Sequence, residues 1–158
     1  MRMLITLIIL AAMCGLIVWQ FNTQKIVLEK HQEKKQSVVA SQETEQQHNC
    51  TGTAFARFRM LGLEANRSAS YKAHFNTGLN QCYALIESTD VSLNVLWKRV
   101  TLYDGDGKVF GTYAWHSQQD RKPTEVPPFN CDVAMPSGEH RACSTETEFR
   151  YLADTYMK

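Results

Sequence analysis

The chain has 158 residues and a mass of 18.0 kDa, which suits one domain of common size with an appendage. Lys and Arg number 17 against 16 Asp and Glu, so the formal net charge is only +1. This balance excludes nucleic-acid binding through bulk phosphate neutralisation, which needs a clustered basic excess. The mean hydropathy is −0.34 although the first twenty residues are almost wholly apolar, so the remainder of the chain is markedly polar.

An apolar run extends from Met3 to Trp19, and Phe21 prolongs it. Its seventeen residues, rising about 1.5 Å each, give about 25 Å of helix, near the short end of a membrane span. No small-x-small site follows the run, and bulky Met13 precedes Cys14. These features disfavour a cleaved signal peptide and a lipidated cysteine. We therefore expect a transmembrane anchor over residues 1–21, with the lipid bilayer as the partner of residues 3–21.

The orientation of this anchor has two interpretations. Lysines beyond the span outnumber Arg2 before it, which would place the domain in the cytoplasm. The very short N-terminal tail and four cysteines beyond the span instead favour a signal anchor with the domain outside. We predict a single-pass inner-membrane protein whose C-terminal domain is periplasmic.

Residues 22–48 contain no Gly or Pro and are rich in Gln, Glu, Lys and Ser. Their charges cancel, and no heptad pattern is sustained. We expect a solvated helical stalk or linker, with a weakly oligomerising stalk as the alternative.

Residues 49–158 are predicted to fold as one extracytoplasmic α+β domain. Apolar residues recur at helical spacing over Thr51–Leu63, which predicts a helix there. Near the end of the chain, Ser144 or Thr145 can cap a final helix. The apolar stripe of that helix consists of Phe149, Leu152 and Tyr156.

Between these helices the pattern favours strands. One strand is expected from Cys82, and alternation predicts two more over Lys98–Tyr103 and Lys108–Trp115. The intervening Asp104–Gly107 is typical of a hairpin turn. Prolines indicate irregular structure over residues 120–142. The expected fold is therefore an antiparallel meander of about three strands flanked by helices, after a transmembrane helix and a helical stalk.

Four of the five cysteines, all beyond the predicted span, form an even set: Cys50, Cys82, Cys131 and Cys143. Four cysteines allow three pairings. We favour Cys131–Cys143, which closes a short loop containing Pro and Gly, with Cys50–Cys82 joining the first helix to a strand. A zinc site is the alternative, but zinc cysteines come in close pairs, and here at least eleven residues separate neighbours. We predict no metal and no cofactor.

Few residues suggest catalysis. A Cys82 nucleophile with His74 as its base needs an unpaired thiol, which the even cysteine count disfavours. Asp104–Gly107 resembles the start of a calcium loop, but Trp115 stands where the twelfth-position Glu is required. No phosphate-binding loop, dinucleotide fingerprint or metalloprotease motif occurs. We therefore predict no catalytic residue.

Aromatic residues gather in and beside the predicted hairpin: Trp97, Tyr103, Tyr113 and Trp115. Alternation sends Tyr113 and Trp115 to the same face. Core packing against the helices is one interpretation, and a partly exposed binding surface for a protein or glycan is the other.

The segment His74–Glu87, HFNTGLNQCYALIE, resembles a pattern in small exported or membrane-anchored bacterial proteins of uncharacterised function. In that pattern a His-aromatic-Asn is followed by Leu, then Cys, then a strand. The resemblance extends over most of residues 50–158. It implies an exported fold in which Cys50 pairs with Cys82, and it carries no activity.

Together these features predict a membrane-anchored binding or accessory domain without catalytic activity. Its partner is expected to be another envelope protein or polymer, not nucleic acid. An envelope hydrolase with a Cys/His site and a structural subunit of a membrane complex are the alternatives.

Overall fold

The computed structural model describes residues 34–35, 38, 40–118, 121 and 125–158. The chain divides into two compact units, Met1–Gln42 and Glu43–Lys158. The second unit begins with a helix, here called the first helix, over residues 43–60.

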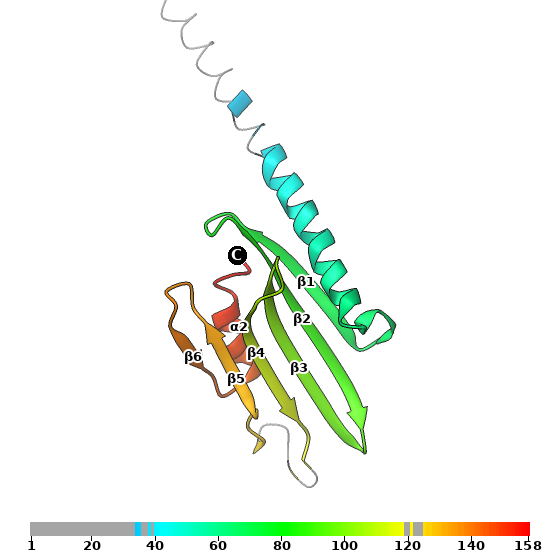
Figure 1. The fold of residues 1–158 in the computed structure, drawn as a ribbon. Coiled ribbons are helices and arrows are strands. Elements are labelled where there is room, and N and C mark those ends of the chain that lie inside the picture. Colours follow the sequence, from blue (N-terminus) through cyan, green and yellow to red (C-terminus); the bar gives the residue numbers. More distant parts are fainter. Residues whose placement is uncertain (1–33, 36–37, 39, 119–120, 122–124) are drawn as a thin grey trace, which may run out of the picture. The chain divides into compact units, whose positions relative to one another are not determined.

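Six strands form a single antiparallel sheet whose strand order follows the sequence. They are β1 (Ala69–Asn76), β2 (Gln81–Ser92), β3 (Val95–Asp104), β4 (Val109–His116), β5 (Asn130–Ala134) and β6 (His140–Ala142) (Figure 1). A short 3-10 turn, η1 (Leu63–Ala65), precedes β1, and helix α2 (Glu146–Ala153) follows β6. The prediction of a meander of about three strands is therefore wrong, because the sheet has twice as many.

The expected strands that do form are β2, β3 and β4, and the predicted hairpin at Asp104–Gly107 is confirmed. Strand β1 was not predicted, because two of its alternating apolar residues are alanines, Ala69 and Ala73, which give a weak apolar signal. Strands β5 and β6 lie within the proline-containing region, but Pro128 and Pro136 fall outside both of them. Proline therefore marked the loops here and did not prevent pairing.

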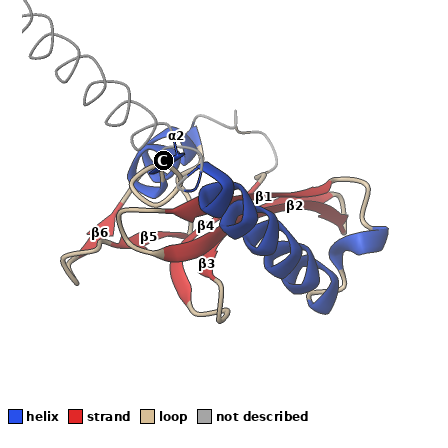
Figure 2. Ribbon diagram, turned by 90° about the horizontal axis from the view of Figure 1, so that it is seen from above, coloured by secondary structure: helices blue, strands red, loops and turns tan. Residues whose placement is uncertain are grey.

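The two helices cover opposite faces of the sheet (Figure 2). Successive residues of β2 show this, because side chains alternate between faces along a strand. The Tyr83 ring lies 4.7 Å from the ring of Tyr156, just after α2. Ala84 packs instead with Ala54 and Phe58 of the first helix.

On the opposite face from α2, the first helix contacts the edge strand β1 through ring packing and side-chain hydrogen bonds. The ring of Phe58 lies 5.3 Å from the ring of Tyr71. The Gln47 side chain accepts a hydrogen bond from the Phe75 amide at 2.9 Å and donates one to the Ala73 carbonyl at 3.2 Å. Gln47 thus satisfies backbone groups on the free edge of the sheet, which would otherwise be open to another strand.

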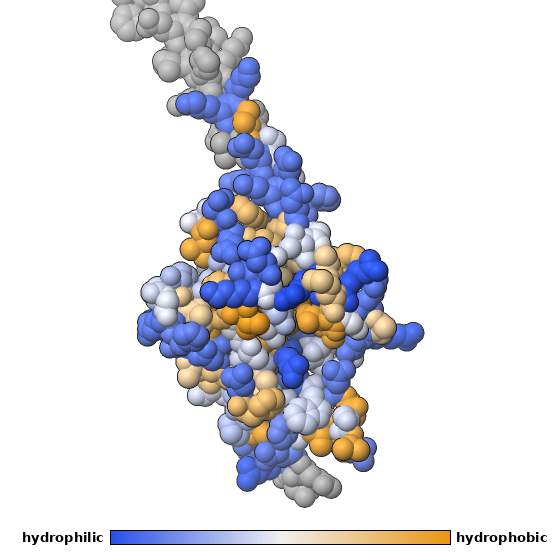
Figure 3. Space-filling model, in the orientation of Figure 1, coloured by the Kyte–Doolittle hydropathy of each residue, from blue (hydrophilic) through white to orange (hydrophobic). Residues whose placement is uncertain are grey.

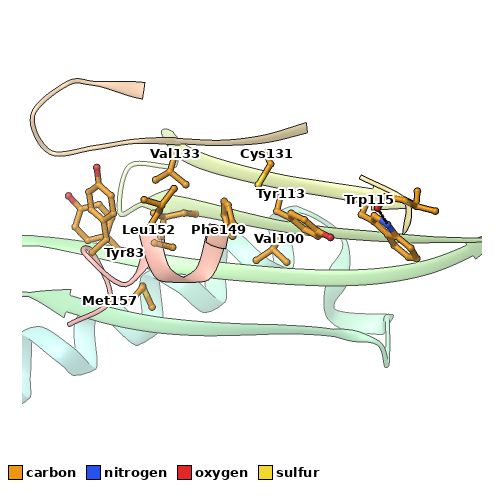
Figure 4. Packing of buried hydrophobic residues seen from close by; sticks show 13 residues of the cluster. Tyr83, Val100, Tyr113, Trp115, Cys131, Val133, Phe149, Leu152 and Met157 are labelled. Atoms are coloured by element: carbon orange, nitrogen blue, oxygen red, sulfur yellow. Dashed lines mark hydrogen bonds between the residues drawn. The ribbon is translucent and has the colours of Figure 1, made fainter. Parts of the chain in front are cut away.

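The larger core lies between the sheet and α2 (Figure 4). Its most deeply buried members are Val100, Leu102, Val133, Phe149 and Tyr156. The predicted final helix is confirmed, and Thr145 is its cap, accepting a hydrogen bond from the Glu148 amide at 3.1 Å.

Two disulfides join the pairs favoured from the sequence. Cys50–Cys82 links the first helix to β2, with Cα atoms 5.3 Å apart. Cys131–Cys143 joins β5 to the residue after β6, with Cα atoms 5.0 Å apart. Disulfides persist in oxidising environments, so these bonds indicate an extracellular or similarly oxidising compartment.

The prediction of an inner-membrane protein requires correction. Within the described ranges, no helix is both long enough and apolar enough to cross a membrane. Residues 3–21, to which the transmembrane prediction applied, lie outside those ranges. The apolar composition of that run was the basis for predicting an inner-membrane location, and the described structure does not support that location.

Candidate binding surface

The aromatic residues singled out in the sequence occupy three different environments. Tyr113 and Trp115 are buried on the α2 face. The Tyr113 ring packs 6.1 Å from Phe149, and the Trp115 indole donates a 2.9 Å hydrogen bond to the Val126 carbonyl. These two residues belong to the core. For these two residues the structure supports the first of the two interpretations drawn from the sequence, core packing against a helix.

Tyr103 and Trp97 lie on the opposite face. Tyr103 packs at the base of the first helix, with the Arg57 guanidinium 5.0 Å from its ring centre. Trp97 is 40% exposed. Of the four predicted residues, Trp97 is therefore the one available to a partner.

A cluster of rings surrounds Trp97. The centroid of its ring system lies 4.8 Å from that of His116 and 6.0 Å from that of Phe129. Phe129, which is 58% exposed, is held in place because its amide donates to the Ala114 carbonyl at 3.0 Å. The sequence did not single out Phe129, because it follows two prolines in a segment expected to be irregular.

Arg99 lies beside this cluster. It pairs across the sheet with Ser88 of β2 and Ala114 of β4. We call Trp97, Arg99, Ala114, His116 and Phe129 the open-face patch. Its β3 and β4 residues lie beyond those that pack against the first helix, and Phe129 comes just before β5.

Two shallow depressions meet at Arg99. One of about 200 Å³ is lined by Trp97, Ala114 and Phe129, and Arg99 and Ser88 form its other side. The second, of about 110 Å³, is lined by Leu61, Leu63 and Tyr103 as well as by Arg99 and Ser88. Arg99 therefore lies between two partly apolar hollows.

The Arg99 side chain forms no hydrogen bond or ion pair with another residue in the described part of the chain. Asp90 lines the same depression, but its carboxylate accepts a 2.9 Å hydrogen bond from the Asn66 side chain. Arg99 is therefore a cation without an internal partner, next to exposed aromatic rings.

The neighbouring strand residue Lys98 shows the opposite behaviour on the α2 face. Its ammonium lies 3.0 Å from Glu87 and 2.9 Å from Glu146. Arg150 completes the group, with contacts of 2.5 Å to Glu87 and 2.7 Å to Glu146. These four half-buried, charge-balanced residues form the ion-pair network that joins α2 to β2 and β3.

The pKa values of this network reflect mutual stabilisation. Burial by itself would raise the pKa of Glu87, but hydrogen bonds from Arg150 and Lys98 outweigh burial and lower it. Burial would lower the pKa of Lys98, but hydrogen bonds to Glu146 and Glu87 raise it. All four groups are satisfied by each other, so the network is a structural feature.

The turn between β2 and β3 presents further apolar side chains. Leu93 and Asn94 both have positive φ, 52° and 62°, which is the backbone of a type I′ turn. Leu93 is 95% exposed and Val91 is 72% exposed. We call Val91 and Leu93 the hairpin tip. Figure 3 shows hydrophobic surface at the end of the molecule where β2 meets β3.

The conformation of Leu93 is unfavourable for its residue type. In the left-handed region the Cβ atom crowds the following carbonyl oxygen, at about 1–2 kcal/mol for residues other than Gly, Asn and Asp. The side chain is too exposed to recover this energy by packing within the domain. Strain of this kind is concentrated at functional positions in proteins.

The residues considered for nucleophilic catalysis do not form a site. Cys82 is bonded to Cys50 and carries no free thiol. His74 lies on β1 opposite Tyr83, and its side chain makes no hydrogen bond with another described residue. The described ranges also contain no group of three or more His, Cys, Asp or Glu side chains arranged to hold a metal ion.

Comparisons with protein-family models, with curated proteins and with solved structures find no match to this chain. The resemblance of His74–Glu87 to exported bacterial proteins stays a prediction.

Proposed function

We propose that this domain is a non-catalytic binding module that recognises another protein through the open-face patch. The observation that carries this proposal is the exposed Trp97–His116–Phe129 cluster beside the unpartnered Arg99. Trp and Arg are among the residues that contribute most to binding energy at protein interfaces. The disulfides support a partner that meets this domain in an oxidising compartment, such as another component of a bacterial envelope.

The hairpin tip favours a protein over a polysaccharide partner. Exposed rings alone would suit either, because aromatic faces also stack on sugars. Leu93, at the turn of the same hairpin, adds an exposed aliphatic side chain near this surface, whereas Val91 pairs with Leu96 and lies on the other face of the sheet. Burying an aliphatic side chain against an apolar partner gains about 1.5–3 kcal/mol, and a hydroxylated polymer does not provide such a partner.

Site-specific photocrosslinking tests this function. A benzoylphenylalanine placed at Phe129 is expected to yield one dominant protein adduct. The matched control is Tyr151, which is 75% exposed on α2, and it is expected to yield little of that adduct. The partner is then purified, and its affinity is measured for the wild type, Trp97→Ala and Tyr151→Ala.

We expect Trp97→Ala to weaken binding at least about tenfold, as for a residue that contributes about 1.4 kcal/mol or more. Tyr151→Ala is expected to leave the affinity unchanged. Equal crosslinking at both positions, or an affinity insensitive to Trp97, would show that binding does not use the open-face patch.

A further inference from the structure

We propose that Arg99 recognises an acidic side chain of the partner, held between two apolar side chains of the same extended segment. This inference rests on the proposed function, because it concerns the ligand of the same open-face patch. It starts from the position of Arg99, which lines both depressions and lies directly across the strands from Ala114 and Ser88.

A partner that covers the exposed rings also covers Arg99. Trp97, Phe129 and Arg99 line one hollow, so a ligand seated there removes water from the guanidinium. An unpaired charge that loses its water carries a large penalty. Asp90 lines the same hollow but forms no ion pair with Arg99, and its carboxylate accepts a hydrogen bond from the neutral Asn66 side chain instead. The partner must therefore supply the counter-charge.

The chemistry of that counter-charge follows from the guanidinium. Arginine is planar and carries several donors that match the two oxygens of a carboxylate. Hydrogen bonds between charged groups are roughly twice as strong as bonds between neutral groups. Their strength increases further in an interface from which water is excluded, because the local dielectric constant is lower. An Asp or Glu side chain of the partner meets these requirements.

The two depressions define the surroundings of that acid. The Trp97–Phe129 hollow lies on one side of Arg99, and the hollow lined by Leu61, Leu63 and Tyr103 lies on the other. In an extended peptide, residues two apart point the same way. The matching pattern is apolar-x-acidic-x-apolar, with the acid at the centre.

The test uses two peptides that differ in a single charge. Acetyl-Leu-Ser-Glu-Ser-Phe-amide carries the proposed pattern, and acetyl-Leu-Ser-Gln-Ser-Phe-amide is its neutral counterpart. Each is titrated into the full chain with its disulfides intact, and binding is followed by the indole N–H resonance of Trp97. The buried Trp115 indole, bonded to Val126, serves as the internal reference.

We expect the Glu peptide to bind at least about tenfold more tightly than the Gln peptide, the preference given by one charge-assisted hydrogen bond. Arg99→Gln is expected to abolish this preference. Arg141→Gln, at an exposed arginine on β6, is expected to retain it.

Three results would overturn the inference. If both peptides shift the Trp97 resonance equally, the patch binds peptide but Arg99 does not select acids, and the proposed function stands. If the preference for the Glu peptide is retained in Arg99→Gln, a residue other than Arg99 binds the carboxylate. If neither peptide shifts Trp97, or tri-galacturonate binds more tightly than the Glu peptide, the patch does not take an acidic peptide.

Discussion

At the scale of single residues, two glycines differ in how closely other atoms pack against them. A Cβ atom added to Gly111 would lie 3.1 Å from both the Asp132 carbonyl oxygen and Val133 Cγ2, and 3.2 Å from the Phe149 ring. A Cβ atom added to Gly52, in the first helix, would meet nothing within 4 Å. The same substitution therefore has opposite expected effects at these two positions.

We expect Gly111→Ala to lower the free energy of unfolding by about 1–3 kcal/mol, because backbone and ring atoms must move apart. Gly52→Ala is expected to raise it by up to about 1 kcal/mol, since Ala is the better helix former. Chemical denaturation of both variants measures the difference. A stable Gly111→Ala protein would mean that β4 and β5 separate more easily than their packing indicates.

Leu93 provides a second test at this scale. Asn tolerates the left-handed conformation better than Leu, so Leu93→Asn is expected to stabilise the fold by about 0.5–1 kcal/mol. The same substitution removes apolar surface from the hairpin tip and is expected to weaken binding of the partner. Leu79→Asn is the control, because Leu79 does not have positive φ and gains no backbone relief. Thermal unfolding and affinity are measured together. A fold destabilised by Leu93→Asn would argue against strain at this turn.

At the scale of elements, α2 depends on the ion-pair network as well as on its apolar stripe. Glu87 has a lowered pKa in the folded protein, so its ionised form is stabilised by folding. Its contribution is present above the ordinary Glu value of 4.5 and is lost as the pH falls through the lowered value. Protonation leaves Lys98 and Arg150 with too little negative charge on the α2 face.

We therefore expect Glu87→Gln to reduce stability at pH 7 and to flatten the fall in stability below about pH 4.5. Glu64→Gln is the control, because Glu64 forms only an exposed pair with Arg59. Denaturation curves from pH 3 to pH 7 compare the three proteins. Parallel pH profiles for wild type and Glu87→Gln would show that Glu87 does not govern acid sensitivity.

At the scale of the whole molecule, the disulfides hold together two cores that lie on opposite faces of one sheet. Cys50–Cys82 has a sequence separation of 32 residues and links the first helix to β2 beside the smaller core. Cys131–Cys143 has a sequence separation of 12 residues and lies beside the larger core. The longer loop loses more conformational freedom in the unfolded chain when it is closed. The first disulfide is therefore expected to stabilise the fold more than the second.

We expect the double variant Cys50→Ala, Cys82→Ala to lower the free energy of unfolding by about 3–4 kcal/mol, and Cys131→Ala, Cys143→Ala by about 2–3 kcal/mol. Hydrogen exchange should show the first variant losing protection in the first helix and β1 while the α2 core stays protected. Uniform loss of protection would mean that the two cores unfold as one.

Local signals in the sequence were sufficient for some features of this fold. Alternation identified the β3–β4 hairpin, the capping pattern identified α2, and spacing identified both disulfides. Each depends on residues close in sequence or on a chemical rule with few alternatives. The three-strand meander required longer-range information, and it differs from the six-stranded sheet. The transmembrane prediction concerned residues outside the described ranges, within which no helix is long and apolar enough to cross a membrane. For Tyr113 and Trp115 the sequence left core packing and exposure both open, and the structure buries them.

The candidate binding surface shows most clearly which features local sequence signals predict and which depend on tertiary packing. The sequence alone predicted a strand over Lys98–Tyr103, in which alternation places Arg99 and Tyr103 on one face. The structure extends this strand to Val95 and so adds Trp97 to the same face. Only the tertiary structure decided that Phe129 lies beside Trp97, that Lys98 has acidic partners, and that Arg99 has none among the described residues. The physical reason is that periodicity assigns a side chain to a face, whereas packing between distant segments decides which part of that face is covered.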